Sequence, residues 1–260
     1  MTAYYNEIDP YAAQWLRNLI AAGHIAPGDV DERSIEDVKP DDIKHYTQCH
    51  FFAGIGVWSY ALRNAGWPDD KPVWTGSCPC QPFSAAGKGG GFDDVRHLWP
   101  TWYWLIKQRS PATVFGEQVS TAFKNGWLDQ VASDLEVADY SFGASNLPAG
   151  AVGARHRRDR LYFVANSNKN TGGRFAGAIH GKKGEVIRSK ESESYRPGFS
   201  CPIPLRGNDG LAREVPESCF PLLVNGSSVV LAQNSAYGNA INAEAAKEFI
   251  LAYIEARASI

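Results

Sequence analysis

The chain has 260 residues, of which 21% are charged and 12% aromatic, and its net charge at pH 7 is −2. This length is enough to bury one substantial core and leaves room for a small appended lobe. There is no run of 18 apolar residues and no basic-then-apolar leader, so we expect a cytoplasmic protein with no membrane partner. The five cysteines form no paired CxxC set, so we expect free thiols and no metal.

Strand and helix patterns alternate along most of the chain. Asp9 and Pro10 are typical of an N-cap and a first helical residue, and apolar residues at helical spacing then continue to Gly23. Further strands are predicted at 3–8, 47–52, 73–77, 113–115 and 161–165, and further helices at 58–65, 98–108, 128–137 and 243–256. This alternation predicts an α/β fold with a mostly parallel sheet and helices on both faces.

The periodicity stops at residues 166–218, which are rich in glycine, proline, serine and charge. Between Asn166 and Arg213, nine basic residues stand against four acidic ones, a local net charge of +5. Such a segment is the electrostatic footprint expected for phosphate contact, although a solvated surface loop can have the same composition. We expect a main domain at 1–165, a small irregular lobe at 166–218, and a C-terminal segment at 219–260 that returns to the main domain.

One cysteine lies between a proline and a glutamine, where the strand predicted at 73–77 gives way to a Gly-rich loop. Open α/β sheets place their chemistry outside the carboxyl ends of their strands. A thiolate at such a place can attack electron-poor carbon if the protein lowers the pKa of the thiol. Pro79-Cys80-Gln81 therefore indicates a nucleophile, and the alternative is a buried structural cysteine.

Five segments together resemble motifs of the DNA cytosine-5 methyltransferases. They are the cysteine loop, the turn Phe51-Phe52-Ala53-Gly54-Ile55-Gly56, the strand Val114 to Val119 with Glu117, the block His156 to Leu161, and the block Tyr237 to Ile241. The resemblance extends over most of the chain. It implies a Rossmann-like class I methyltransferase sheet in the main domain and target recognition by the small lobe.

The resemblance also implies an activity. A small prokaryotic or phage enzyme of this kind would transfer a methyl group from S-adenosyl-L-methionine to C5 of a flipped cytosine in double-stranded DNA, as in restriction–modification. We expect it to act as a monomer. Two functions of other classes stay open: an RNA cytosine-5 methyltransferase on the same scaffold, and a degenerate relative that binds DNA without catalysis.

The family's site residues carry over to positions that match its motifs. Cys80 would add to C6 of the base, Glu117 would hold N3 and the exocyclic amine, and Arg160 would hold O2. Arg158 would keep the surroundings of Cys80 positive. The residues expected at the cofactor are Glu7, Ile8, Asp29, Val30, Phe52, Ala53, Gly54, Gly56, Pro79, Asn239, Ala240 and Ile241. Those expected at DNA are Gln81, Ser84, Lys88, Lys182, Lys183 and Arg188.

Some of these assignments have alternatives. The alternative role for Glu117 is a surface salt bridge, and the alternative for the arginines around position 158 is a plain basic patch. Three positions also depart from the family pattern: His50 stands where the family usually has Asp, Gln118 replaces Asn, and His156 replaces Gln. The hydrogen bonds that the family makes at these positions are therefore in doubt.

The order of the segments also departs from the family. Only 22 residues separate the glycine turn from Pro79, too few for the two strand–helix units that normally lie between them. Upstream, Glu7 lies in a segment that resembles the ribose-binding strand, and Asp29 in one that resembles the adenine-binding strand. We therefore predict a permuted order, in which the strand before Glu7 lies beside the strand before Phe52. The competing hypothesis is a trimmed domain in which Asp69 or Asp70 replaces the ribose acid.

Overall fold

The computed structural model describes residues 2–79, 98–120, 126–154, 158–169 and 240–258, together with the backbone of 203–206 and 212–215. The chain divides into two compact units, one formed by 1–179 and 232–260 and the other by 180–231. The described part of the second unit is an antiparallel pair of strands, β8 (Ile203–Arg206) and β9 (Ala212–Val215). The sequence pattern did not predict this pair.

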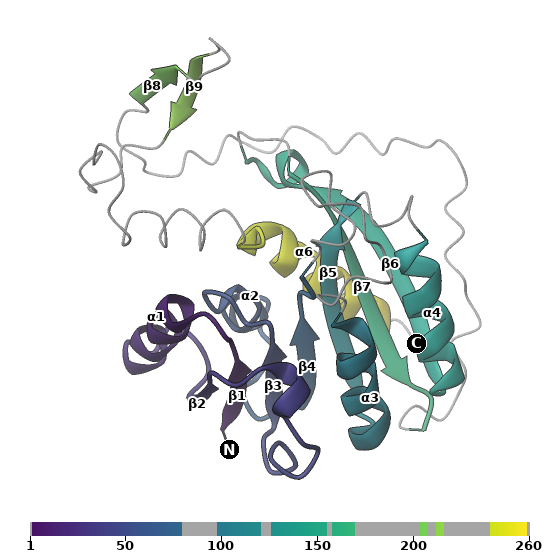
Figure 1. The fold of residues 1–260 in the computed structure, drawn as a ribbon. Helices are drawn as coiled ribbons and strands as arrows, with labels where there is room; N and C mark the ends of the chain where they lie inside the picture. The colour runs from purple at the N-terminus through teal and green to yellow at the C-terminus, as the bar shows by residue number, and fades with distance from the viewer. Residues whose placement is uncertain are drawn as a thin grey trace, which may run out of the picture. The chain divides into compact units, whose positions relative to one another are not determined.

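The described residues of the first unit form a seven-stranded sheet with the order β2-β1-β3-β4-β5-β7-β6. Its parallel part consists of β1 (Ala3–Asn6), β2 (Gly28–Asp31), β3 (Gln48–Phe51), β4 (Val73–Gly76) and β5 (Thr113–Val119). The strand β7 (Asp159–Ser167) lies between β5 and β6 (Tyr140–Pro148) and is antiparallel to both (Figure 1). The predicted mostly parallel α/β sheet is confirmed, whereas β6 was not predicted.

Helices cover both faces of this sheet. The α2 face is covered by α1 (Pro10–Ala21), α2 (Val57–Asn64) and α6 (Ala243–Ala258). The α3 face is covered by α3 (Trp99–Arg109), α4 (Trp127–Val137) and the short 3-10 helix η1 (Ile35–Asp37). A second 3-10 helix, η4 (Ala149–Val152), follows β6. Within the described ranges, no helix has both the length and the apolar character needed to cross a bilayer.

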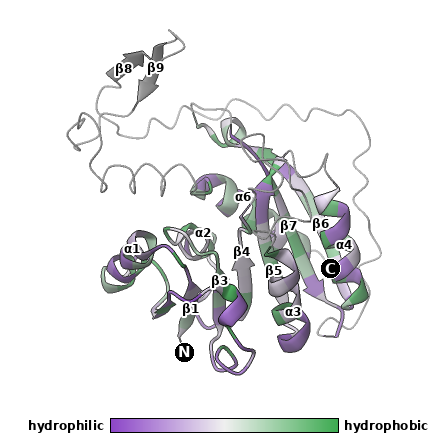
Figure 2. Cartoon of the chain, viewed as in Figure 1, coloured by the Kyte–Doolittle hydropathy of each residue, from purple (hydrophilic) through white to green (hydrophobic). Residues whose placement is uncertain are grey.

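The first helix forms as its sequence predicts. The Asp9 side chain accepts hydrogen bonds from the backbone N–H groups of Tyr11 and Ala12, and Pro10 occupies the first helical position. Leu16 on the inner side of the helix is fully buried, and Gly23 adopts a φ of 72° just after the helix ends. Hydrophilic and hydrophobic residues alternate around α1 in Figure 2, which is typical of a helix packed against one side of a sheet.

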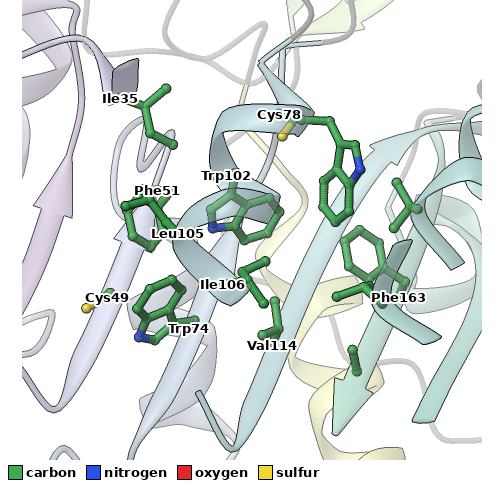
Figure 3. Packing of buried hydrophobic residues seen from close by; sticks show 14 of the residues in the cluster. Ile35, Cys49, Phe51, Trp74, Cys78, Trp102, Leu105, Ile106, Val114 and Phe163 are labelled. Atoms are coloured by element: carbon green, nitrogen blue, oxygen red, sulfur yellow. The ribbon is translucent and has the colours of Figure 1, made fainter. Parts of the chain in front are cut away.

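Aromatic rings fill the core on the α3 face. The Phe51 ring contacts Trp74 and Trp102 at centroid distances of 4.9 and 6.1 Å, and Trp102 also contacts Phe163 at 6.5 Å (Figure 3). These rings lie directly on the backbone of two strands. A Cβ atom at Gly116 would come within 2.1 Å of the Phe163 ring. Glycine is therefore required there, and the next side chain, that of Glu117, points to the opposite face.

Candidate functional site

The carboxyl ends of β1 and β3 meet at the glycine turn. The two strands pair in parallel, with Asn6 opposite Phe51. The backbone N–H of Gly54 donates to Oε2 of Glu7 at 2.7 Å, and that of Asp9 donates to Oε1 at 2.9 Å. The prediction that these two strands lie side by side is confirmed. Burial raises the pKa of Glu7, and these backbone hydrogen bonds act in the opposite direction.

The turn itself has an unusual backbone. Phe52 has a φ of 50°, and Gly54 and Gly56 have φ values of 55° and 80°. A positive φ in a non-glycine residue is strained, and such strain is concentrated at functional sites. A Cβ atom at Gly54 would meet no atom within 4 Å, so the space beside this glycine is open to a ligand. Helix α2 begins directly after Gly56, and its N-terminal N–H groups face the same edge of the sheet.

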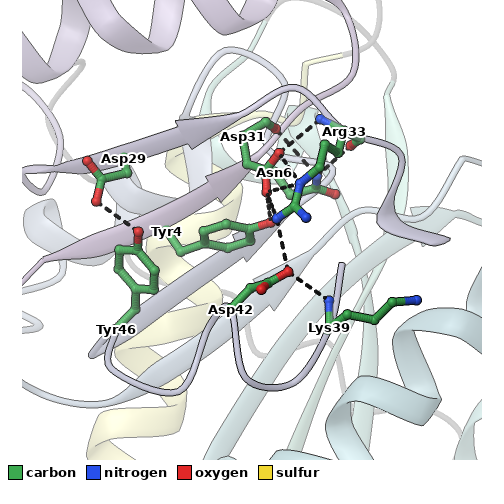
Figure 4. Close-up of polar contacts among 8 residues, drawn as sticks. All are labelled: Tyr4, Asn6, Asp29, Asp31, Arg33, Lys39, Asp42 and Tyr46. Atoms are coloured by element: carbon green, nitrogen blue, oxygen red, sulfur yellow. Dashed lines mark hydrogen bonds and ion pairs between the residues drawn. The ribbon is translucent and has the colours of Figure 1, made fainter. Parts of the chain in front are cut away.

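The two aspartates of β2 are held by different partners. Asp29, inside the strand, accepts from the Tyr46 hydroxyl at 2.8 Å. Asp31, at the strand's end, accepts from the Tyr4 hydroxyl at 2.8 Å and forms a salt bridge with Arg33 at 2.7 Å (Figure 4). The Arg33 hydrogen bonds hold the pKa of Asp31 below its usual range although burial opposes them. Tyr46 contacts Oδ2 of Asp29, so Oδ1 of this exposed carboxylate remains able to accept from an amine.

His50 is buried on the inner strand β3, one residue before the strand ends at the glycine turn. Its Nδ1 lies 2.8 Å from the Thr75 hydroxyl, and its ring stacks on Tyr5 at a centroid distance of 4.9 Å. Burial lowers the pKa of His50 to about 3, so the imidazole is neutral at physiological pH. The position at which the family usually has an aspartate thus carries no charge here.

Glu117 and Arg160 form a buried ion pair at the other side of the glycine turn. Nε of Arg160 lies 2.8 Å from Oε1 of Glu117, and their side chains are 20% and 8% exposed. Burial raises the pKa of Glu117, while the charges of Arg160 and Arg158 and a hydrogen bond from Ser77 lower it. The alternative of a surface salt bridge is wrong because this carboxyl is buried. The ion pair favours the ionised form of the carboxyl and fixes its orientation, whereas burial favours the neutral form.

The segment that leads to Cys80 is held beside Glu117 by strand pairing and by a hydrogen bond. Gly76, the last residue of β4, pairs with Gly116, so Ser77 comes to lie beside Glu117. Nε2 of Gln118 also donates to the Cys78 carbonyl at 3.4 Å. Cys78 itself is buried, which raises the pKa of its thiol, and Pro79 is exposed. Cys80 follows immediately but lies outside the described residues.

The other predicted cofactor residues have varied surroundings. Ile8 is 65% exposed next to Glu7, Val30 packs partly against the core of the α2 face, and Ala53 is buried. Ala240 is partly buried and Ile241 packs in the cluster that contains α2 and α6. His156 lies outside the described ranges. The predicted DNA and cofactor residues that also lie outside them are Gln81, Ser84, Lys88, Lys182, Lys183, Arg188 and Asn239.

The trimmed-domain hypothesis required Asp69 or Asp70 near the glycine turn. Asp69 instead forms a salt bridge with Arg63 at 2.6 Å, and a second hydrogen bond joins the same two side chains at 2.9 Å. Arg63 in turn donates to the Gly23 carbonyl at 2.7 Å. Asp70 is exposed. The acid that contacts Gly54 is therefore Glu7, as the permuted order predicts.

Sequence reasoning missed two residues at this site, Ser77 and Trp58. Nε1 of Trp58 donates to Oγ of Ser77 at 3.1 Å, and Ser77 is hydrogen-bonded to Glu117. The position of Ser77 directly after β4 was a usable signal, but its partner depends on the register of β4 and β5. Across the described ranges, no group of three or more His, Cys, Asp and Glu side chains is placed to hold a metal ion.

A family model for the C-5 cytosine-specific DNA methylases matches residues 64–195, about half of the chain. The chain belongs to this family. The match begins after the glycine turn, so Glu7, Asp29 and the turn itself lie upstream of it. The match therefore includes Cys80, Glu117 and Arg160 of this cytosine-5 methylase.

Curated relatives are type II methyltransferases. The chain is 33% identical to M.HhaI of Haemophilus parahaemolyticus over 103 residues, which cover 38% of this chain and 32% of the relative. It is 30% identical to M.HaeII of Haemophilus aegyptius over 131 residues, covering 48% and 41%. The chain thus spans about a third of the length of the curated relatives that it matches.

Solved structures are similar at lower identity. A DNMT2 mutant from Spodoptera frugiperda is 19% identical with a TM-score of 0.44, and the match covers 65% of this chain and 43% of that one. A putative DNA modification methyltransferase encoded in an E. coli prophage is 19% identical with a TM-score of 0.43, covering 64% and 40%.

Proposed function

We propose that the protein methylates C5 of cytosine in double-stranded DNA with S-adenosyl-L-methionine as the methyl donor. The observation that carries this proposal is the buried pair of Glu117 and Arg160, fixed beside the segment that leads to Cys80. A buried carboxyl with a raised pKa and an adjacent guanidinium can bind both the donor and the acceptor edges of a pyrimidine. Membership of the cytosine-5 methylase family supports the same assignment.

The residues at the ends of β1 and β3 fit the cofactor. Glu7 offers a carboxylate for ribose hydroxyls, and its orientation is fixed by two backbone N–H groups. The open space beside Gly54 and the N-terminus of α2 suit the methionine part. We assign Ile8, Asp29, Val30, Phe52, Ala53, Gly56, Pro79, Asn239, Ala240 and Ile241 to the rest of the pocket. When bound, S-adenosyl-L-methionine supplies an electrophilic methyl group on a sulfonium.

The protein must make C5 of cytosine nucleophilic enough to take that methyl group. The Cys80 thiolate would add to C6, which gives an enamine with electron density at C5. Glu117 would bind N3 and the exocyclic amine and thereby draw charge out of the ring, while Arg160 would hold O2. Arg158 would add positive charge that favours the thiolate. C5 would then take the methyl group, with S-adenosyl-L-homocysteine as the leaving group, and loss of the C5 proton to water would let the Cys80–C6 bond break and release the thiolate.

The base has to leave the duplex before this chemistry, at a cost of a few kcal/mol for unstacking. We assign Gln81, Ser84 and Lys88 to the loop that closes on the DNA, and Lys182, Lys183 and Arg188 to phosphate contacts. The nearly neutral net charge of the whole chain makes this local basic segment the main electrostatic contribution to binding. The same site would accept a cytosine in RNA, so the nucleic acid has to be tested directly.

The decisive experiment offers the purified protein radiolabelled S-adenosyl-L-methionine with duplex DNA or with transfer RNA, followed by nucleoside analysis. We expect 5-methylcytosine in the DNA, and protection of co-expressed plasmid from a methylation-sensitive restriction enzyme. Methylation of RNA alone would favour the RNA enzyme, and DNA binding without methylation would favour the degenerate relative. A methyl group on an exocyclic nitrogen would contradict the assigned roles of Cys80 and Glu117.

A further inference from the structure

Three polar side chains from three elements form a chain that ends at Glu117. The indole Nε1 of Trp58, in the first turn of α2, lies 3.1 Å from Oγ of Ser77, directly after β4. The Ser77 hydroxyl is hydrogen-bonded to Glu117 on β5. The register agrees with this contact, because the last pair between β4 and β5 joins Gly76 to Gly116. Ser77 and Glu117 are therefore neighbours on the α2 face.

The chemistry of the groups fixes the direction of this chain. An indole N–H can only donate, and an ionised carboxylate can only accept. The Ser77 oxygen therefore accepts from Trp58, and its hydroxyl proton points to Glu117 when that carboxyl is ionised. Because hydrogen bonds in a chain polarise one another, the donation by Trp58 strengthens the donation by Ser77.

Trp58 is also held rigidly against the strands that carry the ion pair. Its side chain is buried, and its ring stacks on Phe115, two residues before Glu117, at a centroid distance of 6.1 Å and 23°. It also meets the edge of Tyr162, which pairs with Glu117 across β5 and β7, at 6.1 Å and 79°. Trp58 lies two residues after Gly56, so the same side chain joins the start of α2 to the surroundings of Glu117.

We propose that Trp58 and Ser77 form a directed hydrogen-bond relay that orients the Glu117 carboxyl and connects it to the helix that begins at the glycine turn. Both are positioning residues, because they act on the base through Glu117. Their effect on catalysis rests on the proposed function, whereas their effect on the titration of Glu117 does not. Removal of the Ser77 donor should favour the neutral carboxyl, because its hydrogen bond stabilises the charged form.

The test follows the Glu117 carboxyl by infrared difference spectroscopy during a pH titration, with its band assigned by the loss of the band in Glu117→Gln. Ser77→Ala should raise the pKa of Glu117, and Ser77→Thr, which keeps a hydroxyl, should restore it. Trp58→Phe should raise it by a smaller amount. The double variant should match Ser77→Ala, because phenylalanine keeps an aromatic ring at position 58 and the lost indole N–H reaches Glu117 only through Ser77. Tyr162→Phe is the matched control, since it removes a buried neighbouring hydroxyl that has no hydrogen bond to Glu117 within the described residues.

Two results would overturn the relay. One is a Glu117 titration that does not change in Ser77→Ala, and the other is an additive effect of Trp58→Phe on top of Ser77→Ala. In a methyl-transfer assay, the limb of the pH–rate profile that reports Glu117 should move with the infrared titration while the KM for the cofactor stays constant. If the protein transfers no methyl group, the proposed function fails, but the spectroscopic result still decides whether the relay exists.

Discussion

The carboxylate of Glu7 accepts a hydrogen bond from the backbone N–H of Gly54 at 2.7 Å, although 47 positions separate the two residues. This contact exists because β1 and β3 are parallel neighbours whose carboxyl ends lie at one edge of the sheet. Ligands of open α/β sheets bind at this edge. A permuted order of segments changes which strands are joined along the chain but not which strands lie side by side in the sheet. An acid that precedes the glycine turn in sequence can therefore still lie beside that turn in space.

The first prediction concerns Glu7. Glu7→Ala should weaken binding of S-adenosyl-L-methionine by about tenfold or more, because charge-assisted hydrogen bonds contribute roughly 1.5–3 kcal/mol. Asp29→Ala should also weaken it. Isothermal titration calorimetry measures both, and Glu7→Gln, which keeps an oxygen for the Gly54 N–H, separates the loss of ligand contact from the loss of the turn contact.

Asp69→Ala and Asp70→Ala are the controls for this prediction. Asp69 is engaged with Arg63, and Asp70 is exposed. Both variants should bind the cofactor nearly as well as the wild type. Normal binding by Glu7→Ala together with a large loss in either control would refute the permuted arrangement of the site.

The second prediction separates the two neighbouring cysteines. Cys80→Ala should abolish methyl transfer but leave cofactor binding near normal, because the thiolate takes part only in the chemical step. DNA that carries 5-fluorocytosine in the target should trap a covalent adduct on Cys80, which peptide mass spectrometry can locate. Cys78 is buried and its thiol pKa is raised, so Cys78→Ala should still form the adduct. An adduct on Cys78 would contradict the assignment.

Much of the fold followed from local pattern. Strong alternation of strands and helices predicted β1, β3, β4 and β5, and the resemblance of the segment around Asp29 to an adenine-binding strand predicted β2. The Asp9 cap was visible as a capping residue before Pro10. The strand β6 was missed because its residues, Tyr140–Pro148, mix small and polar side chains on an edge strand that pairs with β7 alone. Such a strand lacks the continuous apolar run that marks a buried one.

The site was predictable only where one residue type carried a chemical signal. Glu117 and Glu7 were visible because each is an acid at or near the end of an apolar run, in a segment that resembles a family motif. Ser77 and Trp58 were not, because a serine and a tryptophan have many structural roles and their contact depends on how α2 packs over β4. Cross-strand register and helix packing are set by the whole core, which a local pattern does not encode.

The third prediction is a pH dependence of stability. Burial raises the pKa of Glu117 above that of an unfolded glutamate, which is about 4.3. Between these two pKa values the folded state binds more protons than the unfolded state, so the free energy of unfolding falls as pH rises. Glu117→Gln should reduce this fall. Urea denaturation at a series of pH values measures it, with Glu136→Gln on the exposed side of α4 as the control. An unchanged slope in Glu117→Gln would contradict the prediction.

The fourth prediction concerns the basic segment. Neutralising Lys182, Lys183 and Arg188 should weaken DNA binding and reduce its dependence on salt. Each lost phosphate contact should reduce the log–log slope by about 0.9 on duplex DNA. Fluorescence anisotropy at several salt concentrations gives both quantities. An unchanged slope would mean that the segment is a surface loop with no contact to the duplex.

The last prediction tests the packing that directs Glu117 to the α2 face. A methyl group at Gly116 would meet the Phe163 ring, whose nearest atom lies 2.1 Å from the ideal Cβ position. Gly116→Ala should therefore lower the free energy of unfolding by about 1–3 kcal/mol, the usual cost of overpacking a core. Gly143→Ala on β6 is the matched control, since a Cβ there would meet no atom within 4 Å. Chemical denaturation of both variants measures the difference, and equal stability of the two would show that the backbone of β5 can move away from Phe163. Because such a movement would also displace Glu117, the methyl-transfer rate of Gly116→Ala should fall more than that of Gly143→Ala.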